Sequence, residues 1–282
     1  MPGHDGIWLV HELQRQHPQT AVVLATAYNE LLDAETVQPE VADLLIKPFQ
    51  RDRFELAVDR GRQWRKEALE ELRWHAQLGL ELTDGVNSVI TDLQTRALDG
   101  TDEAEALLAI GLERVPHTMA HAERVTRYAV SVAAELGLAP DEVTLLELSA
   151  RFHDIGKAPM PLALLTKPSP LTPGEVAVMR RHAEAGGEIL RATCTLSHLA
   201  PVVVASHEAF GGGGYPSQLS GDAIPLASRI ISVADTYDAM TQTRFYRQRL
   251  SSADAVSELL RCSPSQFDPV IVDAFVGVLG RH

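Results

Sequence analysis

The sequence contains almost no cysteine. Its two cysteines, Cys194 and Cys262, lie far apart and form no CxxC pair. This spacing argues against both a disulfide framework and a zinc site built from thiolates. The chain also lacks a basic start followed by an apolar stretch, and none of its apolar runs approaches the roughly 20 residues that a membrane span needs. These absences predict a cytoplasmic protein with no membrane partner.

Positive charge is also in short supply. The chain has 25 Lys and Arg against 38 Asp and Glu, which gives a formal net charge of −13. Binding to a nucleic-acid polymer depends on cations that neutralise phosphates, so we expect no such partner. A small anionic nucleotide would need local cations that override this overall charge.

Aromatic residues are scarce as well, at 5% of the chain, whereas apolar residues in general make up 45%. This composition is typical of a globular protein, and the abundance of Ala, Leu and Glu favours helices. A length of 282 residues exceeds that of one small domain. We therefore expect a mainly α-helical protein with two domains.

Residues 1–60 show a mixed α/β pattern, with a helix predicted at 7–16 and short strands at 21–25 and 42–46. The loop at residues 1–6, Thr26 and the turn Lys47-Pro48-Phe49 resemble, in this order, the second half of a response-regulator receiver domain. The acceptor aspartate and acidic pocket of that family are not found in this sequence. The resemblance therefore implies a partial receiver-like segment, and it carries no prediction of phosphorylation.

A helical linker is predicted at residues 61–100. The sequence from 54 to 97 contains no proline and is rich in Arg, Glu, Leu and Gln, which favours one long helix. Asp84-Gly85 and Asp99-Gly100 are the expected breaks. A homodimer through this helix is one alternative, although the apolar spacing is not a sustained heptad.

Residues 101–282 form a run of predicted helices with clear boundaries. Thr172 with Glu175 has the form of a capping box, and Ser251 with Asp254 marks another helix start. A helix that opens at Pro140 leads to His153-Asp154, and Gly156 is expected to end it.

Metal-binding side chains surround the adjacent pair His153-Asp154. In such a pair the imidazole can bind one metal ion while the carboxylate bridges to a second, and these donors suit Fe, Mn, Co, Ni or Zn. Asp235 and Asp238 lie in an apolar segment, where burying two carboxylates is costly unless cations meet them. A metal cluster would supply those cations. The further donors are His121, His182 and His207.

These and neighbouring motifs together resemble the HD-GYP domain. The matching positions are His121 with Arg124-Val125, His153-Asp154-Ile155-Gly156-Lys157, Leu165-Thr166-Lys167-Pro168, His182 with Gly186, His207-Glu208, Gly214-Tyr215-Pro216, Arg229-Ile230, Ala234-Asp235 with Asp238-Ala239, and Arg244 with Tyr246. The resemblance implies an HD-type helical bundle that binds two divalent transition-metal ions and hydrolyses cyclic di-GMP to linear pGpG or GMP. The implied metal ligands are His121, His153, Asp154, His182, His207 and Asp235.

Catalytic and binding roles can be assigned within this set. Asp154 is the expected bridging carboxylate, and Lys157 can stabilise charge on the phosphate or assist the leaving oxygen. We expect phosphate or guanine contacts from Lys167, Arg229 and Arg244. Tyr215 offers a ring for stacking, next to glycines that leave room for a ligand. The Gly214-Tyr215-Pro216 loop is also a candidate docking site for a diguanylate cyclase domain.

The sequence departs from the family at several positions. Ser206 replaces a histidine that the family uses as a metal ligand, and a neutral hydroxyl is a poor ligand for these ions. Gly211 replaces an aspartate, His117 stands where three-metal members have a glutamate, and Phe245 replaces a proline. Two hypotheses follow: an active cyclic di-GMP phosphodiesterase, or a weakened module that binds the dinucleotide or a cyclase partner without turnover.

Overall fold

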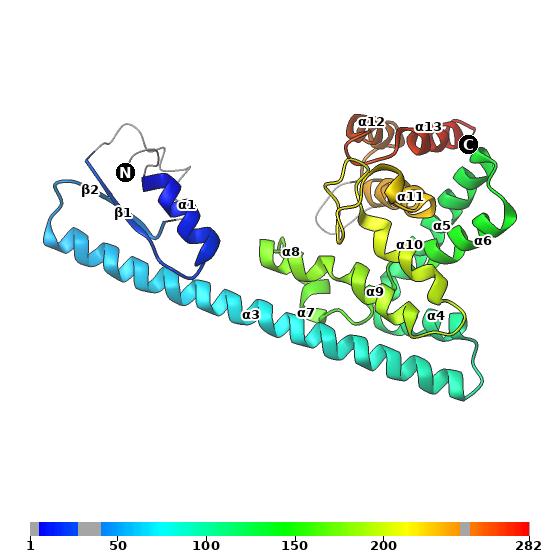
Figure 1. The fold of residues 1–282 in the computed structure, drawn as a ribbon, viewed down its shortest axis with the longest axis horizontal. Helices are drawn as coiled ribbons and strands as arrows, with labels where there is room; N and C mark the ends of the chain where they lie inside the picture. Colours follow the sequence, from blue (N-terminus) through cyan, green and yellow to red (C-terminus); the bar gives the residue numbers. More distant parts are fainter. Residues whose placement is uncertain (1–5, 28–40, 243–248, 282) are drawn as a thin grey trace. The chain divides into compact units, whose positions relative to one another are not determined.

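The computed structural model describes residues 6–27, 41–242 and 249–281. The chain divides into two compact units, Met1–Gln77 and Leu78–His282 (Figure 1). As predicted, the protein is mainly helical, with one small sheet. The finer division into a receiver-like segment (1–60), a linker (61–100) and an HD-GYP-like domain (101–282) stays a prediction.

The first unit contains the expected α/β pattern. Helix α1 (Gly6–Gln16) precedes strands β1 (Val23–Thr26) and β2 (Asp43–Ile46), which pair in parallel with Val23 opposite Asp43. Val10 and Val41 form a small buried core with Ile7, Val22 and Leu24 packed around it. The predicted strands are present, although β1 begins two residues later than expected.

Helix α3 (Arg51–Leu98) is continuous over 48 residues. The break predicted at Asp84-Gly85 is wrong, because both residues lie inside this helix. The glycine has a packing role instead: a Cβ atom on Gly85 would lie 2.3 Å from the Pro159 carbonyl oxygen. The break predicted at Asp99-Gly100 is confirmed, and Gly100 has the positive φ of 87° typical of a glycine after a helix.

The second unit is a helical bundle. Its helices are α4 (Glu103–Arg114), α5 (Pro116–Leu136), α6 (Pro140–Phe152), α7 (Leu162–Leu165), α8 (Pro173–Arg180), α9 (His182–Arg191), α10 (Ala200–Val204), α11 (Leu226–Thr241), α12 (Ser252–Cys262) and α13 (Pro269–Leu279), with short 3-10 turns η1 (Ile155–Lys157), η2 (Ser197–Leu199), η3 (Ala205–His207) and η4 (Gly221–Ala223). The predicted caps are present: Thr172 and Glu175 form the capping box of α8, and the Ser251 hydroxyl accepts from the Asp254 N–H.

Two apolar clusters hold this bundle together. One joins α5, α6, α11, α12 and α13 around residues such as Leu146, Ile230 and Phe275. The other joins the second half of α3 to α4, α9 and α10 around residues such as Ile110 and Ile189. Helix α6 contributes to both clusters, so its C-terminal end is fixed between them.

The end of α6 differs from the prediction. The helix ends at Phe152, His153 is its C-cap, and Gly156 lies in the following turn η1. Gly156 is required by close packing, because a Cβ atom there would lie 1.9 Å from the His182 carbonyl oxygen and 2.5 Å from the Gly186 nitrogen. Turn η1 and the start of α9 are thus pressed together backbone to backbone.

No helix within the described residues combines the length and the apolarity needed to cross a bilayer.

This close approach predicts that Gly156→Ala lowers the free energy of unfolding by about 2–3 kcal/mol, because the new methyl group has to displace backbone. Thermal or urea unfolding measures the effect. Gly213→Ala is the matched control, since no atom lies within 4 Å of the position its Cβ would take. Equal stability of the two variants would contradict the packing role of Gly156.

Candidate metal centre

All of the predicted metal ligands converge in the second unit. His121 comes from α5, His153 and Asp154 from the end of α6, His182 from the first residue of α9, His207 from η3, and Asp235 from α11. They form two groups of three, in each of which the ligand atoms lie within 4.8 Å of one another. We call these the first trio (His121, His153 and Asp235) and the second trio (Asp154, His182 and His207).

The first trio is built around Asp235. Its Oδ1 lies 3.0 Å from His121 Nε2 and 4.0 Å from His153 Nε2. Both histidines therefore direct the same ring nitrogen toward one carboxylate oxygen, which is the arrangement of ligands around a shared cation.

The second trio has the same character. His182 Nε2 lies 2.8 Å from His207 Nε2 and 3.5 Å from Asp154 Oδ1. Two imidazole nitrogens that face each other so closely are satisfied when a cation lies between them and the carboxylate.

Asp154, a member of the second trio, also lies close to the first. Its Oδ2 is 3.6 Å from His153 Nε2 and 3.8 Å from His121 Nε2, whereas its Oδ1 faces His182. One carboxylate oxygen is thus available to each trio, which is the geometry of a bridging ligand.

Orphaned polar atoms show that the site fits metal ions. His153 Nε2 and Asp154 Oδ1 are buried, and among the described residues neither has a hydrogen-bond partner. Leaving such atoms unsatisfied is costly. On the opposite ring nitrogens, His153 Nδ1 and His182 Nδ1 each lie 2.8 Å from a backbone carbonyl oxygen, of Ala150 and Met179. These bonds place the proton on Nδ1 and leave Nε2 as a lone-pair donor.

The electrostatics of the second trio also suit a cation. Burial, aided by the neighbouring His182, lowers the pKa of His207 to about 4, and burial lowers the pKa of His182 as well. Burial alone would raise the pKa of Asp154, but Lys157 and the surrounding histidines hold it well below its usual range. Neutral imidazoles and an ionised carboxylate are the protonation states that bind metal ions.

Asp238 supports the site from behind. Its Oδ2 lies 2.7 Å from His121 Nδ1, and its Oδ1 accepts from Arg124 Nε at 2.6 Å. From the sequence, metal ions were expected to balance the charges of both Asp235 and Asp238. For Asp238 this prediction is wrong, because Arg124 supplies the positive charge. The supporting role was missed, although Arg124 lies one turn after His121 and Asp238 lies one turn after Asp235.

The loop after His207 is held in place by Glu208. Its carboxylate accepts from the backbone N–H groups of Ser217 at 2.7 Å and of Leu219 at 3.1 Å. The sequence suggested that the glycines of this loop leave room for a ligand, but two of them pack against the chain itself. A Cβ atom on Gly211 would lie 2.7 Å from the Ser265 carbonyl oxygen, and one on Gly214 would lie 2.2 Å from the Ala209 nitrogen. Sequence reasoning gave Glu208 no role.

Tyr215 lies over the second trio. Its ring stacks on His207 with centroids 5.2 Å apart and planes 13° apart, and the Arg180 guanidinium carbon lies 5.1 Å from the Tyr215 centroid. Burial, together with the nearby Asp154, raises the pKa of Tyr215 to about 12, so its hydroxyl stays protonated at neutral pH.

Three of the candidate metal ligands, His182, His207 and Asp235, line a cleft of about 720 Å³, a volume within the range of ligand sites. One side holds Lys157, whose ammonium donates to Asp154 Oδ2 at 2.5 Å, together with His182, His207, Tyr215 and Asp235. The other side is formed by α12 and the following loop, through Glu258, Cys262, Gln266 and Phe267.

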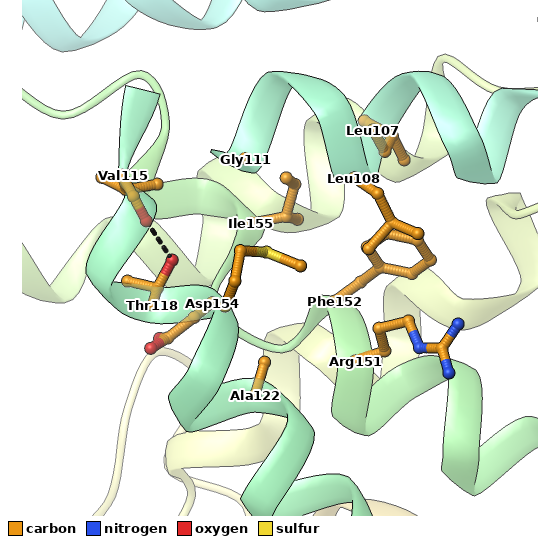
Figure 2. A pocket seen from close by; sticks show the side chains of 11 residues that line it. Leu107, Leu108, Gly111, Val115, Thr118, Ala122, Arg151, Phe152, Asp154 and Ile155 are labelled. Atoms are coloured by element: carbon orange, nitrogen blue, oxygen red, sulfur yellow. Dashed lines mark hydrogen bonds between the residues drawn. The ribbon is translucent and has the colours of Figure 1, made fainter. Parts of the chain in front are cut away.

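A second, much smaller pocket lies behind Asp154, between α4, α5 and α6 (Figure 2). Its lining is mostly apolar, with Leu107, Phe152 and Ile155 facing it, and the Thr118 hydroxyl is turned to the Val115 carbonyl oxygen. Its volume of about 10 Å³ holds at most one water. This pocket is therefore too small to admit a ligand to Asp154.

The remaining predicted residues lie in other surroundings. Lys167 donates to Glu175, and Arg229 donates to Asp222 at 2.9 Å and to Asp268 at 2.7 Å. Ser206 is buried, and its hydroxyl donates to the Val203 carbonyl oxygen at 2.8 Å. Arg244, Phe245 and the side chain of His117 lie outside the described residues.

Known proteins resemble this chain in sequence and fold. A family model described as "HD domain" matches residues 103–271. The "Cyclic di-GMP phosphodiesterase response regulator RpfG" of Xanthomonas campestris pv. campestris is 32% identical over 289 residues, which cover 98% of this chain and 72% of that protein. The "3'3'-cGAMP-specific phosphodiesterase 2" of Vibrio cholerae is 36% identical over 57% of this chain and 31% of that protein.

Among solved structures, "Bd1817, a HDG"Y"P protein from Bdellovibrio bacteriovorus" aligns with a TM-score of 0.50 at 15% identity, covering 79% of this chain and 80% of that one. At this identity the likeness concerns the fold alone.

The support from Asp238 predicts that Asp238→Asn weakens metal binding by about 10- to 100-fold, because the His121 ring loses the carboxylate that orients it. Metal titration followed by elemental analysis measures the effect. Asp92→Asn is the control, since Asp92 also pairs with an arginine, Arg96, but contacts no metal-binding side chain. Unchanged affinity in Asp238→Asn would contradict the supporting role.

Proposed function

This chain belongs to the HD domain family and, within it, to the HD-GYP proteins, and we propose that it hydrolyses cyclic di-GMP to linear pGpG or GMP. The observation that carries this proposal is the pair of donor trios next to an open cleft, with one oxygen of Asp154 near each trio. The relative from Xanthomonas, named a cyclic di-GMP phosphodiesterase, matches nearly the whole chain. That match includes most of the receiver-like segment, which supports a role in two-component signalling.

We propose that two divalent transition-metal ions, drawn from Fe, Mn, Ni, Co and Zn, occupy the site. His121, His153 and Asp235 would hold one ion, and Asp154, His182 and His207 the other. Ions bound there would supply Lewis acidity, which activates a water and offsets charge on the phosphate. Asp154 fixes the spacing between the trios through its two oxygens.

The chain's own residues complete the chemistry. The Lys157 ammonium, held beside Asp154, stabilises negative charge on a phosphate oxygen above the floor of the cleft and can give a proton to the leaving oxygen. Tyr215 binds the substrate with its hydroxyl or with the part of its ring that His207 leaves open. Lys167 and Arg229 remain candidate contacts that would have to exchange their carboxylate partners, and Arg244 remains a sequence-based candidate.

The alternative function is binding without turnover. The observation that favours it is Ser206, whose proton is committed to a backbone carbonyl where the family has an imidazole ligand. One ligand fewer weakens one metal position, and catalysis by a metal pair requires both.

We predict that protein purified without chelator carries about two metal ions per chain and cleaves cyclic di-GMP when Mn or Fe(II) is added. Elemental analysis and chromatography of the products measure the two quantities. Fewer than two ions together with no turnover would contradict the phosphodiesterase function. If the same sample still bound cyclic di-GMP, the result would identify a binding module.

Ser206→His is expected to raise both metal content and turnover, because it adds an imidazole next to His207. Ser206→Ala is the control, since it removes the hydroxyl and adds no ligand. A folded Ser206→His variant with wild-type metal content would show that this position is not the limiting one.

We also propose two protein partners. The exposed Leu72 and Leu80 on α3 suit a homodimer through this helix. The loop at Gly214-Tyr215-Pro216, fixed by Glu208, suits docking of a diguanylate cyclase domain. Sedimentation velocity of wild type and Leu72→Glu tests the first: a dimer that the variant converts to monomer supports it, whereas a monomeric wild type contradicts it.

A further inference from the structure

The cleft poses an electrostatic problem for an anionic substrate. The chain carries a net charge of −13, and Asp235 and Glu258 line the cleft. Asp154 is buried beside Lys157 and His182, which also line it. A cyclic dinucleotide brings two more negative charges. Ions held by the two trios would serve the phosphate that is cleaved, so the second phosphate needs a cation from the chain.

Several cations of the second unit are already neutralised. Lys157 donates to Asp154 and Lys167 to Glu175, while Arg229 is paired with Asp268. Arg124 is committed to Asp238 behind His121. A phosphate that recruited one of these groups would first have to break an ion pair.

Arg180 differs from all of them. It is the last residue of α8 and is exposed, and its guanidinium contacts the Tyr215 ring. Within the part of the chain that the structure describes, it forms no ion pair with a carboxylate. Tyr215 in turn lines the cleft and stacks on His207, a member of the second trio.

A guanidinium that lies against an aromatic ring is well prepared for a phosphate. The ring contact restricts the side chain and leaves N–H groups free along the edge of the guanidinium plane. Two such groups match two phosphate oxygens in a bidentate contact. Arg180 therefore has the charge and the free donors that the second phosphate requires, and it contacts Tyr215, a residue that lines the cleft.

We propose that Arg180 binds the phosphate that is not cleaved, and that the contact between Arg180 and Tyr215 aligns this phosphate with the second trio. This role rests on the proposed function, because it presumes a substrate with two phosphates. It assigns Arg180 to substrate binding rather than to the chemical step.

The test compares Arg180→Gln with wild type in steady-state hydrolysis of cyclic di-GMP with Mn. We expect KM to rise about 10- to 100-fold with kcat within about threefold of wild type, because a charge-assisted contact to bound substrate is lost. Metal content should be unchanged. Arg180→Lys should recover part of the KM, since it keeps the charge without the bidentate edge.

Salt dependence separates a phosphate contact from mere support of Tyr215. For wild type, kcat/KM should fall as NaCl increases, and this dependence should be weaker in Arg180→Gln. A supporting role alone would lower kcat and leave the salt dependence intact. Arg191→Gln is the charge-matched control: Arg191 is exposed at the end of α9, and among the described residues its guanidinium lies over no aromatic ring.

The possible results distinguish a failure of the Arg180 role from a failure of the proposed function. A wild type that cleaves cyclic di-GMP, with Arg180→Gln unchanged in KM and in salt dependence, overturns the role of Arg180 and leaves the proposed function standing. A wild type that neither cleaves nor binds cyclic di-GMP overturns the proposed function itself. If wild type binds without turnover, the Kd of cyclic di-GMP replaces KM, and an unchanged Kd in Arg180→Gln overturns the inference.

Discussion

The structure of the site depends on the burial of one ionised carboxylate, Asp154. A carboxylate in such a place is costly unless cations compensate it. The Lys157 ammonium provides part of the compensation at 2.5 Å, but Asp154 Oδ1 has no hydrogen-bond partner among the described residues, and His153 Nε2 is equally unsatisfied. These atoms indicate where positive charge has to be added: next to His153 Nε2 in the first trio and next to Asp154 Oδ1 in the second. Metal binding thus follows from the cost of burial as well as from the identity of the donors.

The fold is organised to hold this carboxylate from several directions. Helix α6 packs in both apolar clusters of the second unit, so the residues at its end have little freedom. Gly156 lets the next turn approach the start of α9, which brings His182 to Asp154. On the opposite side Asp238 holds His121, and Glu208 holds the loop that places Tyr215 over His207. These supporting residues do not bind the ion or the substrate themselves. They fix the orientation of side chains that are proposed to do so.

Much of this arrangement could be predicted from the sequence. The mainly helical fold, the boundaries of α8 and α12 and the clustering of all the proposed ligands followed from caps, spacing and the HD-GYP resemblance. Contacts between backbones were not predictable, because a glycine in a sequence can mark either a helix end or a close approach of another segment. Gly85 and Gly156 resemble helix breaks in the sequence, yet at both positions another backbone approaches the chain. Which charged side chains form ion pairs was also not predictable from the sequence. The sequence shows that Lys167, Arg180 and Arg229 are cations, but only the fold shows that Glu175 and Asp268 neutralise two of them.

The central proposal is that two metal ions bind here, each in contact with a different oxygen of Asp154, and anomalous X-ray scattering from crystals grown with Mn tests it most directly. The account predicts two anomalous peaks, one among His121, His153 and Asp235 and one between His182 and His207, each within about 2–2.3 Å of a different oxygen of Asp154. A single peak, or two peaks of which only one contacts Asp154, would contradict it.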